Sequence, residues 1–555
     1  MAGKFLHIKS KTITSAAFIL AASTLVSKLL GLIRDRILAG KFGAGDELDI
    51  YYTVFRIPDT VYAVFILGAV SSAFIPVFSQ YLARDEKEAW RLANTVLTIS
   101  VAALLLVSFI LIIFAPFIVP LIAPGFQGEK LSLTIFLTRI MFLSPVIFGI
   151  SSVVGAVLQI SRRFFVYSLA PIFYNAGIII GALWLTDVAR ILGFERLAGL
   201  VAGVLLGAVL HLCIQIPSAV TSGFRYRPLW DFAHSGFRKV VSLFIPRMIG
   251  LAVYQINFFV ITALASTLRE GSIAVFNLAN NLQYLPIGIF GISFATAAFP
   301  VLSEKFSKND KIQFSGNFFT TLRTILVFVV PLSVFFFLLR AQIVRMVLGT
   351  GEFGWDDTRL TAAALGIFAI SIVPQSIIPL LARGFYALHD TKTPVMVSSV
   401  SVGANIILSF FFMWLLSFPN FFGNSFKILL DLEDIPDVRI LGLIFAFSLS
   451  SVFYFFVLLF LFFIRTGFPI FRVMLGGGGR ILLASVLAGI GVYGGLNVFS
   501  RFVDLSTFPG VFVQLFGAVS AGGIIYIFSL MILRAPELKT ISQSLKSEFL
   551  RPPAT

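Results

Sequence analysis

The chain has 555 residues, of which 58% are hydrophobic and 12% are charged, and its mean hydropathy is +0.98. Because soluble domains carry about twice that charged fraction, the composition excludes a water-soluble globular protein. The formal net charge of +16 does not indicate nucleic-acid binding, since the basic residues fall in short loops between apolar runs. That placement is typical of membrane topology and of contact with lipid headgroups.

Turns and charges divide the chain into fourteen apolar segments, each close to or above the length of about 20 residues that crosses a bilayer. The segments are 13–39, 48–81, 92–122, 131–160, 165–186, 197–220, 240–266, 272–303, 314–346, 358–387, 393–417, 440–464, 481–500 and 508–533. We therefore predict an all-α polytopic membrane protein with about 14 transmembrane helices.

An even number of spans places both termini on the same side of the membrane. Most Lys and Arg residues fall on that side, for example Lys4, Arg162, Arg225 and Arg465. The positive-inside rule then predicts that both termini are cytoplasmic. The basic N-terminus runs into the first span without a small-residue cleavage site, so we expect a retained helix and not a signal peptide.

The first two predicted helices carry charges that a lipid-facing helix would exclude. On the first helix steps of three and four place on one face Thr24, Ser27, Lys28, Gly31, Arg34 and Asp35. On the second helix Asp49, Arg56 and Asp59 are seven and three apart, again on one face. Ionised side chains inside a membrane cost a few kcal/mol each, about 3 kcal/mol on insertion scales. They must therefore face protein or water.

Two interpretations of these charges stay open. The charges could pair with one another in a purely structural network, Arg34 with Asp35 or Asp49, and Arg56 with Asp59. Alternatively, they line a hydrated cavity that receives a charged or sugar-bearing substrate. An excess of cations would suit an anionic group, because a guanidinium binds phosphate oxygens bidentately.

The residues do not indicate catalytic or metal-binding chemistry. The four His residues are scattered without ligand spacing, and the two glycines of KFGAGDELD (41–49) fit a tight turn better than a phosphate-binding loop. His389 and Asp390 stand at a predicted helix end, where capping is expected. The single cysteine, Cys213, lies in an apolar run, and we expect it in the core.

An internal repeat accounts for most of the chain. AFIPVFSQY (73–81) resembles AAFPVLSEK (297–305), GAVLQISRRFF (155–165) resembles GFYALHDTKTP (384–394) in pattern, and Asn175 and Asn405 fall at a similar offset. The separations of 224, 229 and 230 residues predict two parallel six-helix lobes, with chance similarity between apolar helices as the alternative. The predicted division is 1–222 for the first lobe, 223–470 for the second and 471–555 for two extra helices and a cytoplasmic tail, with a glycine hinge at 476–479.

The run SKLLGLIRDRILAGKFGAGDELDIYYTVFRIPD (27–59) resembles the signature of the MurJ/MviN lipid II flippases, in the multidrug/oligosaccharidyl-lipid/polysaccharide exporter superfamily. The resemblance continues through AFIPVFSQY, APGF (123–126), GAVLQISRRF and GFYALHDTKTP, and so spans nearly the whole chain. It implies fourteen helices, made of two six-helix lobes around a central cavity and two extra helices that form a groove for a lipid tail. It also implies alternating access.

The resemblance also assigns residues. Arg34 and Asp35 match the family's RD pair, and Asp49 matches its Asp after the loop. Lys28 stands where the family commonly has a functional Arg, which keeps the charge and loses the bidentate geometry. Two positions depart further, since Tyr62 and Asn281 stand where cavity arginines are expected.

The expected function is translocation of undecaprenyl-diphosphate-linked peptidoglycan precursor (lipid II) across the bacterial cytoplasmic (inner) membrane, in cell-wall biogenesis. Lys28, Arg34 and Arg56 would hold the diphosphate, and Asp35 and Asp49 would orient these cations. The expected partners are this polyprenyl-diphosphate-linked glycan lipid and membrane lipids, with no nucleic acid, cofactor or metal. Membrane potential or a monovalent cation would supply the energy to a monomer. The alternatives are a flippase for another lipid-linked glycan, an exporter of a small cation or drug, and a transport-inactive membrane scaffold.

Overall fold

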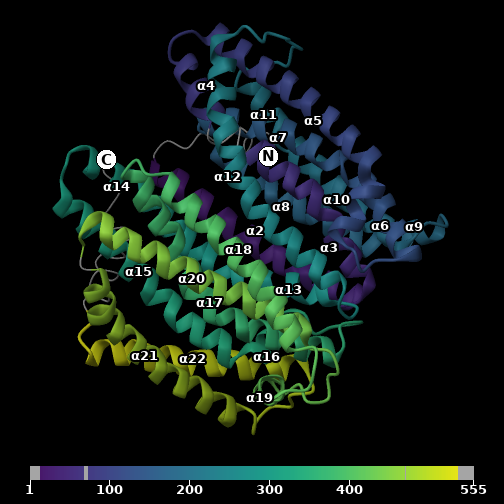
Figure 1. Ribbon diagram of the computed structural model, residues 1–555. Coiled ribbons are helices and arrows are strands. Elements are labelled where there is room, and N and C mark those ends of the chain that lie inside the picture. The colour runs from purple at the N-terminus through teal and green to yellow at the C-terminus, as the bar shows by residue number, and fades with distance from the viewer. Residues whose placement is uncertain (1–12, 68–72, 469, 536–555) are drawn as a thin grey trace. The chain divides into compact units, whose positions relative to one another are not determined.

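The structure is a computed structural model that describes residues 13–67, 73–468 and 470–535 (Figure 1). In these ranges the chain forms helices and no β-strand. The chain divides into two compact units. Unit 1 contains residues 1–274 and 350–353, and unit 2 contains residues 275–349 and 354–555.

Unit 1 is built from long helices broken by short turns. Its helices are α2 (Ile13–Phe42), α3 (Asp46–Val61), η1 (Tyr62–Leu67), α4 (Ile75–Leu82), α5 (Glu86–Ile122), α6 (Gly128–Met141), α7 (Leu143–Ile160), α8 (Phe164–Ile180), η3 (Gly181–Leu185), α9 (Thr186–Ile191), α10 (Arg196–Cys213), α11 (Ile216–Thr221) and α12 (Ser235–Ser266). The turn between α2 and α3 confirms the predicted use of glycine, because Gly43 has a φ of +62°, which L-residues rarely adopt.

Unit 2 follows the same plan. Its helices are α13 (Ser272–Pro286, whose first turn belongs to unit 1), η4 (Ile287–Ile292), α14 (Ser293–Ser307), α15 (Lys311–Leu338), α16 (Arg340–Val347), α17 (Trp355–Ala387), α18 (Lys392–Leu415), α19 (Phe421–Leu430), α20 (Arg439–Thr466), α21 (Ile470–Phe499) and α22 (Phe508–Ile532). The last two, α21 and α22, pack side by side (Figure 1).

Eleven helical stretches in the described ranges are long and apolar enough to cross a membrane, and the chain is a multi-pass membrane protein. Large apolar side chains on them face outward, such as Phe117 at 71% and Leu121 at 76% exposed, as contact with lipid requires. The other three predicted spans fall on α2, on α3, η1 and α4, and on α12, and residues 68–72 of the second of these spans lie outside the described residues. The count of fourteen is compatible with this arrangement and stays a prediction.

The repeat is visible in the local geometry of the two units. The π-helical segments η1 and η4 begin at Tyr62 and Ile287, 225 residues apart. Asp85 and Asp310, also 225 apart, both precede the next helix and accept hydrogen bonds from its first backbone N–H groups. Such N-caps satisfy donors that no helical partner can reach. A π-helix is rare and is frequent at functional sites, so its recurrence at the same register supports the repeat.

Close helix contacts in unit 1 depend on glycine. Gly177 and Gly181 on α8 and η3 face Gly203 and Gly207 on α10. A Cβ on Gly203 would lie 2.2 Å from the Cα of Gly181. Small residues four apart let membrane helices approach closely. This contact places α8, which carries Asn175, firmly against α10.

Two predictions about single features are wrong. The glycines at 476–479 form no hinge, because α21 runs through them as one helix, as expected where backbone groups within a membrane need internal partners. Cys213 is exposed, not part of the core. An apolar run in a membrane protein does not by itself distinguish a side chain that faces lipid from one that faces protein.

Candidate functional site

The charged face of α2 borders open space. Lys28 and Arg34 are both half-buried, and Gly31 lies between them on the same face. A Cβ built on Gly31 would meet no described atom within 4 Å. On a neighbouring face Leu29 and Ile33 are 52% and 50% exposed. The space beside Gly31, which lies between these two cations along the helix, is therefore open, and the ammonium nitrogen of Lys28 itself is buried.

Arg34 is held by two side chains. Its Nε and Nη2 both donate to Oδ1 of Asp35, at 3.0 and 2.7 Å, and its Nη1 donates to Oδ1 of Asn175 at 3.0 Å. Asn175 donates in turn to the carbonyl of Pro171, one helical turn earlier on α8. Asp35 and Asp49 were the two partners predicted for Arg34, and the structure contains the ion pair with Asp35. A guanidinium has five N–H donors, and no described atom accepts from the remaining two.

Arg56 on α3 is positioned by α12. Its Nε donates to the Thr262 hydroxyl at 2.8 Å, and its guanidinium lies over the Phe258 ring, 5.2 Å from the ring centre. Asp59, one turn further along α3, is exposed and lies within electrostatic range of both Arg56 and Arg34. Arg34, Arg56 and Asp59 thus belong to one charged group within unit 1.

Tyr52 is a member of this group that the sequence analysis missed. It lies four residues before Arg56, on the same face of α3, and its hydroxyl is buried without a hydrogen-bond partner among the described residues. Asp35, Arg34 and Arg56 are all within electrostatic range of it. An unsatisfied buried hydroxyl costs about 1–3 kcal/mol, so a water molecule or a ligand atom is expected to bind there. The spacing to Arg56 was the signal that could have identified it.

The carboxylate of Asp49 binds backbone groups at the start of α13. Its two oxygens accept hydrogen bonds from the backbone N–H groups of Gly271 at 2.9 Å and Ala274 at 2.8 Å. The Lys130 ammonium lies 3.8 Å away and also pairs with Asp46. Asp49 is only 2% exposed. In this structure its carboxylate therefore stabilises the first turn of α13, and it does not orient Arg34 as the sequence analysis expected.

A family model described as lipid II flippase MurJ matches residues 38–513. The chain belongs to the MurJ lipid II flippase family. Among MurJ relatives, it is 29% identical to a probable lipid II flippase MurJ of Vibrio cholerae, with 73% of this chain and 78% of that protein covered, and 32% identical to one of Thermotoga maritima, with 70% and 78% covered. The family is one of transporters, so the protein is not an enzyme.

Solved structures agree with this family assignment. The fold matches a structure titled lipid II flippase MurJ in an inward closed conformation, with a TM-score of 0.72, 26% sequence identity, and 93% of this chain and 99% of that one covered. A multidrug resistance MATE transporter of the MOP superfamily, solved in an inward-facing conformation, matches with a TM-score of 0.61 at 14% identity, covering 80% and 94%. That second likeness concerns the fold alone.

The two positions that depart from the MurJ pattern lie in different units. Tyr62 begins η1 in unit 1, and its ring centre is 5.1 Å from that of Phe148. Asn281 is half-buried on α13 in unit 2. At the repeat spacing of 225 residues, Asn281 is the counterpart of Arg56. The charge at this repeat position is therefore present in unit 1 and replaced by an amide in unit 2.

Proposed function

We propose that this protein translocates lipid II, the undecaprenyl-diphosphate-linked peptidoglycan precursor, across the bacterial cytoplasmic membrane. The observation that carries the proposal is the charged face of α2, where Lys28 and Arg34 flank the open space beside Gly31. Membership of the MurJ family supplies the lipid-linked cargo. A diphosphate is the part of that cargo which two cations can bind.

The arrangement of donors suits a phosphate group that binds reversibly. Without cargo, Asp35 neutralises Arg34 and Asn175 fixes its orientation. The two free N–H groups of Arg34 would then bind phosphate oxygens without breaking either contact. Arg56 and Lys28 add the charge needed for a diphosphate, and the Tyr52 hydroxyl offers a further donor. Asp59 would reduce the net charge of the empty site.

We further propose alternating access of a central cavity between two parallel lobes, which correspond to residues 1–222 and 223–470. The polyprenyl tail would stay in lipid along α21 and α22. The loop charges support cytoplasmic termini. Membrane potential or a monovalent cation would drive the cycle, and the protein would act as a monomer.

The test is complementation of a bacterium depleted of its own lipid II flippase. We expect the wild-type chain and Arg190→Ala to restore growth, and Arg34→Ala to fail at equal membrane abundance. Arg190 is the matched control, because it is an exposed arginine of unit 1 away from the charged group. If Arg34→Ala restores growth as well as the wild-type chain does, the cavity proposal is wrong.

Transport of a different lipid-linked glycan is the second candidate, favoured by Tyr62 and Asn281. If the wild-type chain fails to restore growth, the lipid that co-purifies with it distinguishes the remaining cases. A different polyprenyl-linked glycan in its mass spectrum would support another cargo. A spectrum without any polyprenyl lipid would support a transport-inactive scaffold.

A further inference from the structure

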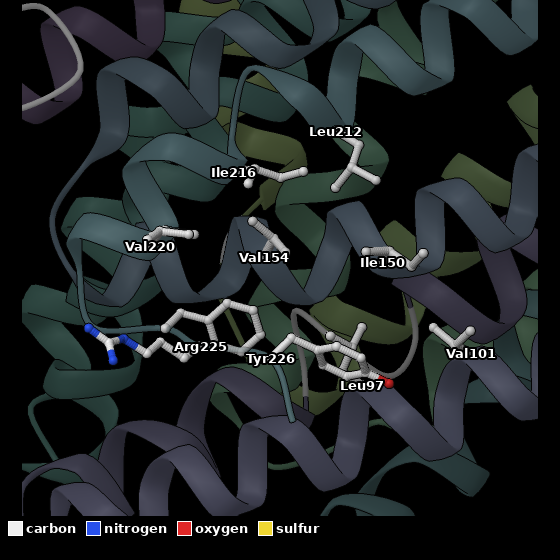
Figure 2. Close-up of a pocket in the computed structure, with 11 residues that line it drawn as sticks. Leu97, Val101, Ile150, Val154, Leu212, Ile216, Val220, Arg225 and Tyr226 are labelled. Carbon is white, nitrogen blue, oxygen red and sulfur yellow. The ribbon is translucent and has the colours of Figure 1, made fainter. Parts of the chain in front are cut away.

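Unit 1 contains an apolar groove of about 410 Å³, whose lining residues are drawn in Figure 2. None of these residues belongs to the charged group on α2 and α3. Side chains of α5, α7, α10 and α11 line it, among them Leu97, Val154, Leu212 and Val220. Apart from Arg225 and Tyr226, every lining side chain is aliphatic or phenyl. The volume lies within the range of about 300–1,000 Å³ that is typical of small-molecule sites.

One wall of the groove is formed by Phe224, Arg225 and Tyr226. They belong to a non-helical segment, residues 223–231 (GFRYRPLWD), which we call the strap. Three side chains on one face of α5 hold it. The Asn94 amide donates to the carbonyl of Arg225 at 3.2 Å and accepts from the N–H of Arg227 at 2.9 Å. Thr98 accepts from the N–H of Leu229 at 3.2 Å, and Arg91 pairs with Asp231 at 2.8 Å. The strap is therefore a fixed part of the fold.

The strap has the composition of a membrane–water interface. Tyr226 and Trp230 are 54% and 61% exposed, and aromatic side chains of this kind concentrate at the headgroup level. Arg225 is also exposed, and its guanidinium lies at one end of the groove, with Val101 towards the other (Figure 2). One end of the groove thus offers a cation beside aromatic side chains of the kind found at the headgroup level, and the rest continues between apolar helices.

We propose that this groove binds one acyl chain of an anionic phospholipid, with Arg225 bound to the phosphate. Apolar walls exclude a polar ligand, because each buried polar group without a partner carries a desolvation cost. The cation favours a lipid with net negative charge over a zwitterionic one. Val220 and Ile216 are 53% and 43% exposed, so a chain can enter from the side. The proposal rests on unit 1 alone and does not depend on which cargo the protein transports.

The test uses the full-length protein in detergent, titrated with phosphatidylglycerol or phosphatidylcholine and analysed by native mass spectrometry. We expect phosphatidylglycerol to bind about fivefold more tightly, the preference that one basic residue gives at a lipid surface. Arg225→Gln should abolish this preference, and Arg227→Gln should keep it. Arg227 is a matched control because it is an exposed arginine of the same strap that does not line the groove.

A second pair of variants tests the groove itself. Val220→Trp fills it from an exposed position, and Val209→Trp places the same bulk on α10 outside it, at a residue 41% exposed. Only the first should lower phosphatidylglycerol binding. Cys213, the only cysteine, adjoins the lining residue Leu212 and is exposed, so a bimane label there reports on contact with a brominated acyl chain.

Three outcomes would overturn the proposal. The first is equal binding of the two phospholipids to the wild-type protein. The second is an equal effect of the groove and control variants, or of Arg225→Gln and Arg227→Gln. The third is preferential binding of undecaprenyl phosphate, which would assign the groove to a polyprenyl tail. The flippase proposal is tested separately, because growth complementation measures transport and these titrations measure lipid binding.

Discussion

Oδ1 of Asp49 accepts a hydrogen bond from the backbone N–H of Ala274, 2.8 Å away, although the two residues are 225 positions apart in the sequence. That separation equals the spacing of the internal repeat, so Asp49 binds the residue at its own repeat position. The other oxygen accepts from Gly271. A side chain of α3 therefore supplies the cap that the first turn of α13 needs.

We expect Asp49→Ala to lower the stability of the protein by about 2 kcal/mol, the range for losing hydrogen bonds to a buried charged group. Asp49→Asn should recover part of this loss, because its amide oxygen can accept one of the bonds. Thermal unfolding of the purified protein measures the effect. Asp187→Ala is the control, since Asp187 forms a surface pair with Lys41 worth at most about 1 kcal/mol. Equal midpoints for Asp49→Ala and wild type would contradict this role.

Arg34→Lys tests whether the planar guanidinium matters beyond its charge. Lysine keeps the charge but cannot donate to Asp35, Asn175 and a phosphate from one rigid group. We expect translocation of fluorescent lipid II in proteoliposomes to fall about tenfold and to remain above that of Arg34→Ala. Arg190→Lys should transport at the wild-type rate. If Arg34→Lys also transports at the wild-type rate, the positive charge is sufficient and the planar guanidinium is not required.

The double variant Tyr62→Arg with Asn281→Arg restores the two charges that the family pattern contains. If their loss altered the cargo, we expect the double variant to improve growth of the flippase-depleted strain. Tyr62→Phe keeps the ring against Phe148 and should leave growth unchanged. No improvement by the double variant, at equal abundance in the membrane, would count against an altered cargo.

The cap at the start of α18 predicts a pH dependence. Asp390 accepts hydrogen bonds from the backbone N–H groups of Lys392 and Thr393 and from the Thr393 hydroxyl. Partial burial alone would raise the pKa of Asp390, but these bonds and the charge of Arg465 outweigh it and lower the pKa below its ordinary value. The carboxylate therefore stabilises the folded state above the unfolded pKa of about 3.9. That stability is lost as the pH falls through the lower, folded value.

Accordingly, Asp390→Ala should lower the thermal midpoint at pH 7 by the equivalent of about 1 kcal/mol. The difference from wild type should stay constant from pH 8 to pH 5 and shrink below about pH 4. Asp356→Ala, at an exposed position of the first turn of α17, provides a comparison without this cap. A difference that already changes between pH 7 and pH 5 would show that another group is responsible.

Much of the fold could be predicted because a membrane imposes strict rules on sequence. Apolar length marks each span, and the charges of α2 and α3 stood out against that background. Asp390 was expected to cap a helix and does so, because Asp favours such positions from local geometry alone. The short helix α19 was missed, since it lies between two spans, where hydropathy carries little information.

The sequence by itself determined the class of protein, the repeat and the face on which Lys28, Arg34 and Arg56 lie, because helical periodicity and hydropathy are properties of neighbouring residues. Only the tertiary structure decided what each charge contacts. In the folded protein Arg34 donates hydrogen bonds to Asp35 and Asn175. Asp49 accepts from the backbone of Gly271 and Ala274, and Asn94 accepts from the strap. Apart from the Arg34–Asp35 pair, these contacts join residues more than a hundred positions apart, and their partners depend on how the helices pack.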